Sequence, residues 1–273
     1  MAAERPAAVE VDPPVAGRWT ALNSPADKVP SHGTHAYGQA YAIDIVAGAA
    51  EDEAKDAREV TDAKDGDARG DGTAAALGAA IEEGKGDTKG DAKGDAKEFA
   101  KEAGAEEEVR PGFRWLWPVV RRNRDFPAFG RPLYAVADAT VVHASDGQRD
   151  HLSRNSLLAL IYLMTVEAFV RDTLGVSKIF GNHVILDLGD GVYAAYAHVQ
   201  RGSLAVRAGD RVRAGQQLGS CGNSGNSTEP HLHFQLMNGP DLDSARGIPF
   251  RWRGVGVPPN GEAFTVTAPV LPV

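Results

Sequence analysis

The stretch STEPHLHFQL, residues 227–236, places two histidines one residue apart within an alternating apolar pattern. Successive side chains of a β-strand point to opposite faces, so His231 and His233 share one face while Leu232 and Phe234 share the other. The apolar pair predicts a face that packs on a core. The paired imidazoles are either solvated, as one face of many antiparallel sheets is, or part of a metal or acid–base site.

Other strand-like runs surround this stretch and are separated by glycine turns. Residues 182–188 and 192–199 flank Gly189-Asp190-Gly191, which is a hairpin signal. Further strands are expected within 40–46, 132–144 and 203–222. A helical pattern is clear only at 151–173. The predicted fold class is therefore mostly β, a compact antiparallel sheet with one helical excursion.

Residues 47–109 differ from the rest of the chain in composition. They carry 19 acidic and 9 basic side chains, a local net charge of −10 that is larger in magnitude than the −8 of the whole chain. They also include the repetitive KGDTKGDAKGDAK at 85–97. Few large apolar residues are present to offset the entropy of ordering, so we interpret this segment as a disordered acidic insert. The predicted organisation is one domain from 1–46 and 110–254, interrupted by the insert, with an extended tail at 255–273.

Simple features of the sequence limit the classes of protein to consider. The single Cys221 excludes an internal disulfide framework and a multi-thiolate zinc site. The longest apolar run, 157–170, contains Glu167 and is too short to cross a bilayer, so no transmembrane helix is expected. The amino terminus lacks a basic region followed by an apolar one, so no secretory signal is expected and the localisation is left open.

Eight histidines supply most of the candidate chemistry: His32, His35, His143, His151, His183, His198, His231 and His233. Together with a carboxylate they fit a zinc site in which three protein ligands leave one position for water. Asp44, within the apolar run AYAIDIV at 40–46, is the candidate carboxylate, because an aspartate is depleted in strands and costly to bury alone. From these stretches alone, an exposed strand face explains the residues equally well.

Three segments read together resemble the lysostaphin-like zinc metallopeptidases of the M23 family: SHGTHAYGQAYAIDIV (31–46), GVYAAYAHV (191–199) and GNSGNSTEPHLHFQL (222–236). The runs at 129–147 and 206–225 resemble the strands that lie between those motifs in the family. The resemblance implies a groove on a duplicated-hybrid-motif β-fold, one Zn²⁺ and hydrolysis of amide bonds. The implied partner is a peptide substrate, usually the stem or cross-bridge of peptidoglycan, with no nucleic acid.

Carried over position by position, the resemblance makes Asp44 and His233 metal ligands. His231 and His198 match the two catalytic histidines that are not ligands. His231 is then the expected general base, and His198 the residue that holds the water or the oxyanion. His198 is expected to face the groove together with Tyr196.

The first histidine ligand departs from the commonest family pattern, because Ala40 occupies the position four residues before the aspartate. Some members instead carry a longer loop with a histidine nine residues before it, which matches His35. We therefore predict His35 as the third ligand, with His32 as the alternative.

Two other classes of function stay open at this point. A non-catalytic peptide- or glycan-binding module could use the same fold. The run VRAGDRVRAGQQLG at 206–219 also resembles the short strands of carrier and phosphotransfer domains, although no lysine follows Lys178 for a carrier group to modify. Which bond is cleaved and the oligomeric state are not set by the sequence.

Overall fold

The computed structural model describes residues 7–50, 109–113, 115, 118–154, 156–157 and 175–269. The chain divides into two units, one of Met1–Glu51 with Val109–Val273 and one of Asp52–Glu108. Everything described here belongs to the first unit. The predicted acidic insert lies outside the described residues except for its two ends.

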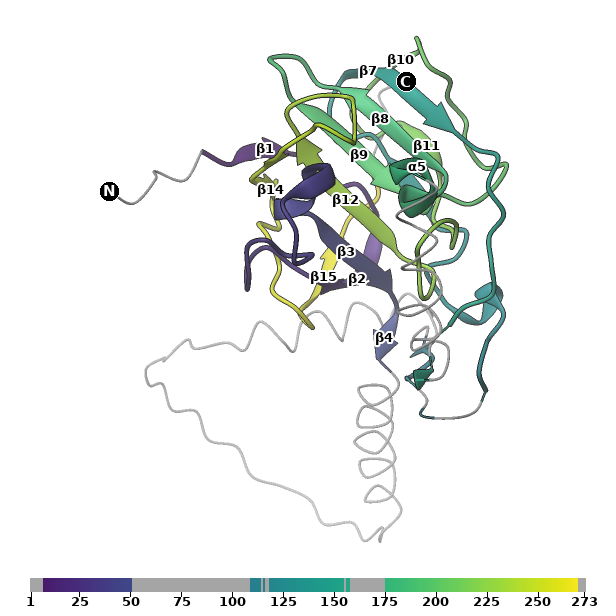
Figure 1. Ribbon diagram of the computed structural model, residues 1–273. Coiled ribbons are helices and arrows are strands. Elements are labelled where there is room, and N and C mark those ends of the chain that lie inside the picture. The colour runs from purple at the N-terminus through teal and green to yellow at the C-terminus, as the bar shows by residue number, and fades with distance from the viewer. Residues whose placement is uncertain are drawn as a thin grey trace, which may run out of the picture. The chain divides into compact units, whose positions relative to one another are not determined.

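Within the described residues, a nine-stranded sheet forms the centre of the first unit (Figure 1). All of its pairings are antiparallel. The strand order is β10 (Arg211–Val212), β7 (Ala139–Ser145), β8 (His183–Asp187), β9 (Tyr193–Ala197), β12 (Leu232–Met237), β3 (Ile43–Ala47), β2 (Gly17–Leu22) and β15 (Ala263–Val266), with β13 (Gly247–Ile248) also paired to β12.

Smaller elements surround this sheet. Three two-stranded pairs join β1 (Val9–Val11) to β14 (Phe250–Trp252), β6 (Pro132–Tyr134) to β11 (Gln217–Ser220), and β4 (Ala49–Ala50) to β5 (Val109–Arg110). The first and last of these pairs are parallel. The described helices are short: η1 (Ala36–Tyr41), η2 (Asn123–Asp125) and α5 (Val176–Phe180).

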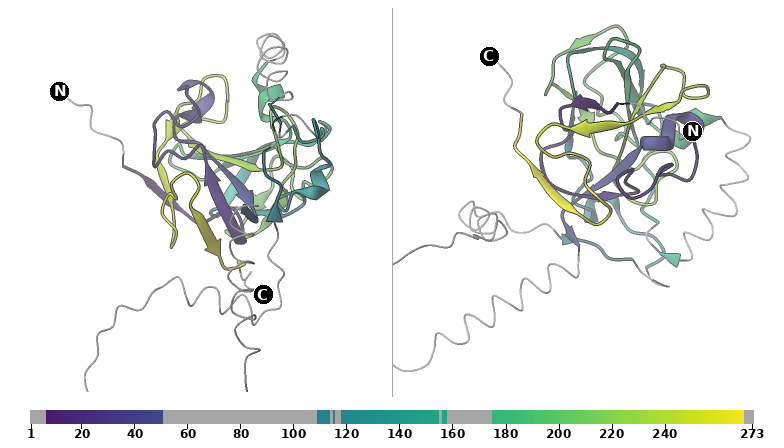
Figure 2. Two further views of the ribbon diagram at one scale, coloured as in Figure 1. Left: turned by 90° about the horizontal axis from the view of Figure 1, so that it is seen from below. Right: turned by 90° about the vertical axis from the view of Figure 1, so that its left-hand side faces the viewer.

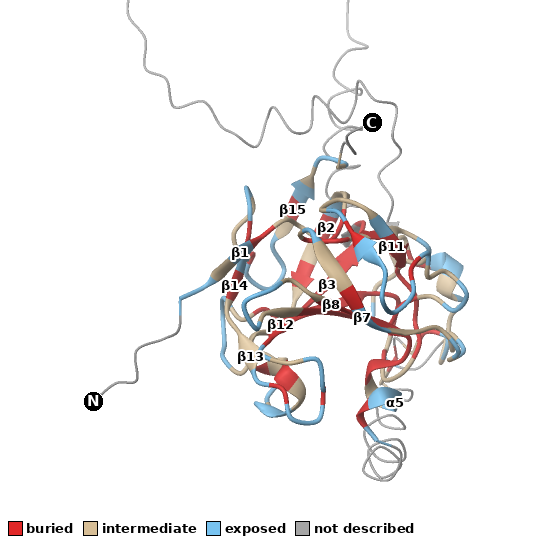
Figure 3. Cartoon of the chain, turned by 90° about the horizontal axis from the view of Figure 1, so that it is seen from above, coloured by how far each residue is buried: buried red, intermediate tan, exposed pale blue. Residues whose placement is uncertain are grey.

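The central strands are buried on both faces, and Figure 3 shows this as red ribbon along β3, β8 and β12. Leu232 and Phe234 of β12 point into the main hydrophobic core, where the rings of Phe234 and Tyr196 lie 5.3 Å apart, edge to face. The alternate residues of the same strands, such as Ala197 and His233, point to the opposite face. The period-two pattern read from residues 227–236 is confirmed.

The strands predicted from the sequence are present, and so is the hairpin. β8 and β9 pair across Gly189-Asp190-Gly191, where all three residues have positive φ, as a tight strand connection of this kind requires. The predicted segment 132–144 forms β6 and β7, and 203–222 contains β10 and β11.

One expectation about elements needs adjustment, and the expected tail can be described in more detail. Residues 151–154 are not helical, and Ser153 instead bridges to Arg121; residues 155 and 158–173 of the expected helix lie outside the described part. The expected tail after residue 254 contributes β15, which lies along β2 at the edge of the sheet (Figure 2). Phe264 of this strand packs in the core. Among the described residues, no helix combines the length and hydrophobicity needed to span a bilayer.

Candidate metal centre

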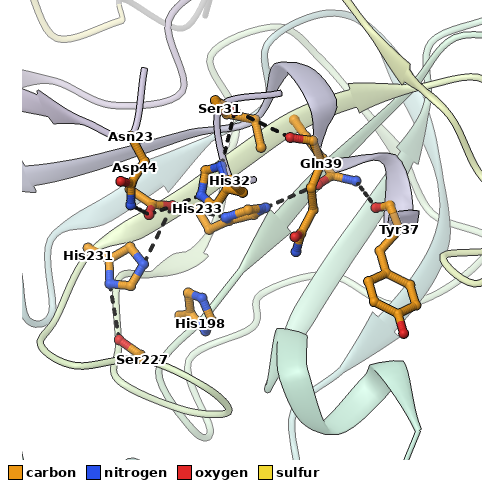
Figure 4. Close-up of polar contacts among 12 residues, drawn as sticks. Asn23, Ser31, His32, Tyr37, Gln39, Asp44, His198, Ser227, His231 and His233 are labelled. Atoms are coloured by element: carbon orange, nitrogen blue, oxygen red, sulfur yellow. Dashed lines mark hydrogen bonds and ion pairs between the residues drawn. The ribbon is translucent and has the colours of Figure 1, made fainter. Parts of the chain in front are cut away.

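Asp44 and His233 lie directly opposite each other on neighbouring strands. β3 and β12 are antiparallel with Asp44 in register with His233, so both side chains leave the same face of the sheet. His233 Nδ1 is 2.9 Å from Asp44 Oδ1, and both residues are buried. Figure 4 shows the two side chains meeting at the centre of the site.

His32 reaches the same carboxylate from the loop before β3. Its Nε2 is 3.1 Å from Asp44 Oδ2. One donor atom from each of His32, Asp44 and His233 lies within 4.8 Å of the other two. Among the residues that the structure describes, these three side chains form the group that could hold a metal ion.

His35, the residue predicted as third ligand, is not part of this group and is exposed at the start of η1. The reason is the path of the loop. Ser31 binds back to its far end, with its N–H 3.0 Å from the Ala40 carbonyl and its Oγ donating to the Ala42 carbonyl at 2.6 Å. His32 therefore sits at the base of a closed loop beside Asp44, whereas His35 is carried away from it.

The positions of the protons explain what these three residues are suited to bind. Gln235 Nε2 donates to the Tyr37 carbonyl, so Gln235 Oε1 faces His233 Nε2 and accepts its hydrogen at 3.0 Å. Ser31 Oγ, whose own hydrogen goes to a carbonyl, can accept the Nδ1 hydrogen of His32 at 3.1 Å. The remaining nitrogens, His233 Nδ1 and His32 Nε2, then turn lone pairs toward the Asp44 carboxylate.

Lone pairs that converge from three residues are stabilised by a cation between them, either a metal ion or a proton on an imidazole. Two imidazole nitrogens and one carboxylate are a ligand set that zinc prefers, and bonds of about 2.1 Å in a tetrahedron separate ligand atoms by roughly 3.4 Å. The distances from Asp44 to His32 and His233, 3.1 and 2.9 Å, are close to that spacing. The residues present therefore fit a zinc ion.

His231 stands on the other side of Asp44. Its Nδ1 hydrogen is donated to the Glu229 carbonyl at 2.8 Å, with Ser227 Oγ 3.0 Å away, and its Nε2 is 3.6 Å from Asp44 Oδ1. Because a carbonyl can only accept, the lone pair of neutral His231 is on Nε2, which faces the site.

His198 joins the site in a way that strand alternation does not predict. It directly follows β9 and has φ of 60°. The left-handed conformation ends the alternation, so His198 lies with its ring centroid 4.7 Å from that of His231 and 5.9 Å from that of His233. Tyr196 was expected on this face with His198; it is instead buried in the core, where its hydroxyl accepts the Val136 N–H.

The electrostatic surroundings separate the roles of these groups. Burial opposes ionisation of Asp44. Without a metal ion between the side chains, protonated His32 and His231 and hydrogen bonds from protonated His233 and His32 outweigh burial and hold the pKa of Asp44 well below its usual range. Burial, reinforced by His231 and His233, lowers the pKa of His198 well below its usual value. Neutral His198 donates from Nδ1 to the Ser224 carbonyl at 2.8 Å, which leaves Nε2 as an acceptor.

Cys221 gives no competing nucleophile. It is buried, and burial, together with the nearby Asp150 carboxylate, raises the pKa of its thiol. A protonated thiol inside the core is a poor nucleophile.

Sequence reasoning missed the residues that hold the site in place. Asn23 Nδ2 donates to Asp44 Oδ2 at 2.8 Å, and Gln235 and Ser31 set the tautomers of two histidines. Gln235 could have been found, because it is a polar residue on the same face of β12 as His233, two residues on. Asn23 and Ser31 lie in turns that carry no comparable signal.

The model for peptidase family M23 matches residues 165–244, which include His198, His231 and His233. Glycyl-glycine endopeptidase ALE-1 of Staphylococcus capitis is 48% identical over 58 residues, 21% of this chain and 16% of that protein. The chain therefore carries an M23 peptidase domain. The family match begins after the predicted insert and does not include His32 or Asp44.

A second relative agrees with this assignment. Peptidoglycan DD-endopeptidase ShyA of Vibrio cholerae is 37% identical over 57 residues, 21% of this chain and 13% of that protein. The crystallised catalytic domain of lysostaphin from Staphylococcus simulans is 25% identical and covers 50% of this chain and 83% of that one, with a TM-score of 0.29. The matched regions cover only 16% of the length of ALE-1 and 13% of the length of ShyA.

Proposed function

We propose that the protein is a zinc-dependent endopeptidase that hydrolyses amide bonds in peptidoglycan peptides. The observation that carries the proposal is the convergence of His32, Asp44 and His233 on one point, with His231 and His198 beside them. The M23 match and the names of the relatives, which are peptidoglycan or glycyl-glycine endopeptidases, support the substrate class.

In this proposal, His32 Nε2, the Asp44 carboxylate and His233 Nδ1 hold the zinc ion. Bound there, zinc would supply Lewis-acid chemistry, polarising the substrate carbonyl and lowering the pKa of a water ligand. Ser31, Gln235 and Asn23 keep the three ligands in orientation through their second hydrogen bonds.

His231 and His198 manage the protons. His231 presents the Nε2 lone pair toward the site and acts as general base, taking a proton from the attacking water and returning it to the leaving amine. His198 also presents an Nε2 lone pair. In its neutral form it can accept a hydrogen bond from water but cannot donate one to an oxyanion, so we assign it to orienting the water.

A non-catalytic binding module on the same fold is the rival function. Such a module has no need of buried histidines whose tautomers are set by specific acceptors. Burying four of these five ionisable side chains in one place is costly, and a metal-dependent reaction would account for that cost.

The test is hydrolysis by the purified full chain together with its zinc content. Zinc-loaded protein is expected to release new amino termini from oligoglycine or from purified peptidoglycan peptides, detected by mass spectrometry. His231→Ala should keep its zinc, because His231 is not a ligand, while kcat falls by roughly 10²- to 10⁴-fold.

His143→Ala is the matched control, since His143 is exposed and stacks on His183 away from Asp44. It should leave both zinc content and hydrolysis unchanged. Zinc-loaded wild-type protein that binds these substrates without cleaving them would establish the binding module instead.

A further inference from the structure

We propose that Arg110 and Glu229 form a positioning pair that holds His231 in its active orientation, and that this pair connects the Asp44 strand to the His231 loop. The inference deepens the proposed function and rests on it for the role of His231. The two residues are 119 positions apart in sequence. None of the hydrogen bonds or ion pairs described above joins either of them to one of the three proposed zinc ligands.

The pair is an ion pair formed away from solvent. Arg110 Nη2 donates to Glu229 Oε1, and the two side chains are 23% and 8% exposed. Taking a carboxylate this far out of water is unfavourable unless a cation compensates for it. Arg110 is therefore expected to contribute to the position of Glu229.

The position of Glu229 affects His231 because the backbone carbonyl of Glu229 is hydrogen-bonded to the His231 ring. Its carbonyl accepts the Nδ1 hydrogen of His231 at 2.8 Å and the hydroxyl hydrogen of Ser227 at 2.7 Å. Pro230, with a fixed φ, is the single residue between Glu229 and His231. A shift of Glu229 therefore moves the acceptor that selects the tautomer of His231.

Arg110 is itself fixed to the strand that carries Asp44. It lies in β5, which pairs in parallel with β4 in the register Ala50↔Arg110. β4 follows β3 after the single residue Gly48. Arg110 thus connects the continuation of the Asp44 strand to the loop before His231. Through this connection, the position of His231 is fixed relative to Asp44.

The pair can be tested with Arg110→Met, which keeps the length of the side chain and removes its charge. In zinc-loaded protein, kcat should fall roughly tenfold to a hundredfold, because displacement of a catalytic group by about 1 Å has an effect of that size. KM and zinc content should stay within about twofold, since neither ligands nor substrate contacts are altered. Arg110→Lys, which keeps a cation near Glu229, should recover most of kcat.

A second readout does not depend on hydrolysis. Long-range ¹H–¹⁵N spectra at mildly alkaline pH report which ring nitrogen of His231 carries hydrogen, with His231→Ala identifying the signal. Wild type should show the Nδ1–H form, and Arg110→Met should show a mixture of both forms. If wild type does not hydrolyse peptides but the tautomer shifts as stated, the proposed function fails and the positioning pair stands.

Arg251→Met is the matched control, because Arg251 makes a 2.8 Å ion pair with Glu10 in which the two side chains are 61% and 41% exposed. It should change neither readout. If Arg110→Met does not fold, Glu229→Gln gives the same two readouts with a smaller loss of kcat. Unchanged kcat and an unchanged His231 tautomer in the variant that folds would overturn the proposal.

Discussion

Two groups of histidines share one face of the sheet, and the ring of Phe180 lies between them. Its centroid is 5.5 Å from that of His233 in the candidate metal centre and 6.2 Å from that of His183. His183 stacks on His143 with centroids 4.6 Å apart and ring planes at 14°. Each group contains a buried imidazole on a strand, His233 in the first and His183 in the second, yet only the first group surrounds a carboxylate.

The difference shows what turns histidines into a metal centre. Around Asp44, second hydrogen bonds direct nitrogen lone pairs inward at an anion. In the other group, His183 donates from Nδ1 to the Gly181 carbonyl at 2.7 Å, and burial, followed by the charge of His143, lowers its pKa to about 4. A buried imidazole without an anion nearby stays neutral and packs as an aromatic ring.

The largest effect is expected from removing a ligand of the metal centre. His32→Ala should weaken zinc binding by more than about a hundredfold, since each ligand contributes several kcal/mol to a site of this kind. His35→Ala, in the same loop but exposed, should bind zinc as wild type does. Competition with a chelator, measured on both variants, checks the assignment; the opposite ranking would restore His35 as the ligand.

A smaller effect is expected from the residue that sets the tautomer of His233. Gln235→Met removes the acceptor of His233 Nε2 and allows the hydrogen to move to Nδ1, the atom that faces Asp44. Zinc affinity should fall roughly 10- to 100-fold. Gln235→Glu keeps an acceptor and should bind more tightly than Gln235→Met. Equal affinities for the two variants would mean that the hydrogen bond does not orient the ligand.

The stacked pair should affect stability but not zinc. Because the folded-state pKa of His183 is lowered to about 4, the unfolded chain takes up a proton first as the pH falls below 6.5. Stability from this group is complete above pH 6.5 and is lost as the pH falls toward 4, by at most about 3 kcal/mol. His183→Phe keeps a ring and lacks this loss.

Urea unfolding of zinc-free wild type and His183→Phe at several pH values measures the difference. The free energy of unfolding of wild type should decrease more steeply between pH 6.5 and 4 than that of the variant. Parallel curves would show that His183 does not titrate in this way, and reduced zinc binding by the variant would join the two histidine groups into one site.

Much of the site was predictable because it is built on strands. Alternation placed His231 and His233 on the face opposite Leu232 and Phe234, and an aspartate in an apolar strand marked Asp44. The period of a strand is a local property of the backbone, so the sequence was enough to assign faces. The resemblance to the M23 family then supplied the roles.

Alternation failed where the backbone leaves the strand conformation. At His198 a φ of 60° turns the side chain to the face opposite that of Tyr196. Nothing in the local sequence indicates such a conformation for a non-glycine residue. The same holds in the loop before β3, where the hydrogen bonds of Ser31 decide that His32 and not His35 reaches Asp44.

The sequence by itself determined the mostly β fold, the faces of the central strands, and the histidines and carboxylate from which a metal centre could be built. Only the tertiary structure decided which loop histidine completes the set, which nitrogen of each ring faces the centre, and that Arg110 reaches the loop of His231. The physical reason is range: side-chain alternation depends on adjacent residues, whereas loop closure, tautomers and buried ion pairs depend on contacts between residues far apart in the chain.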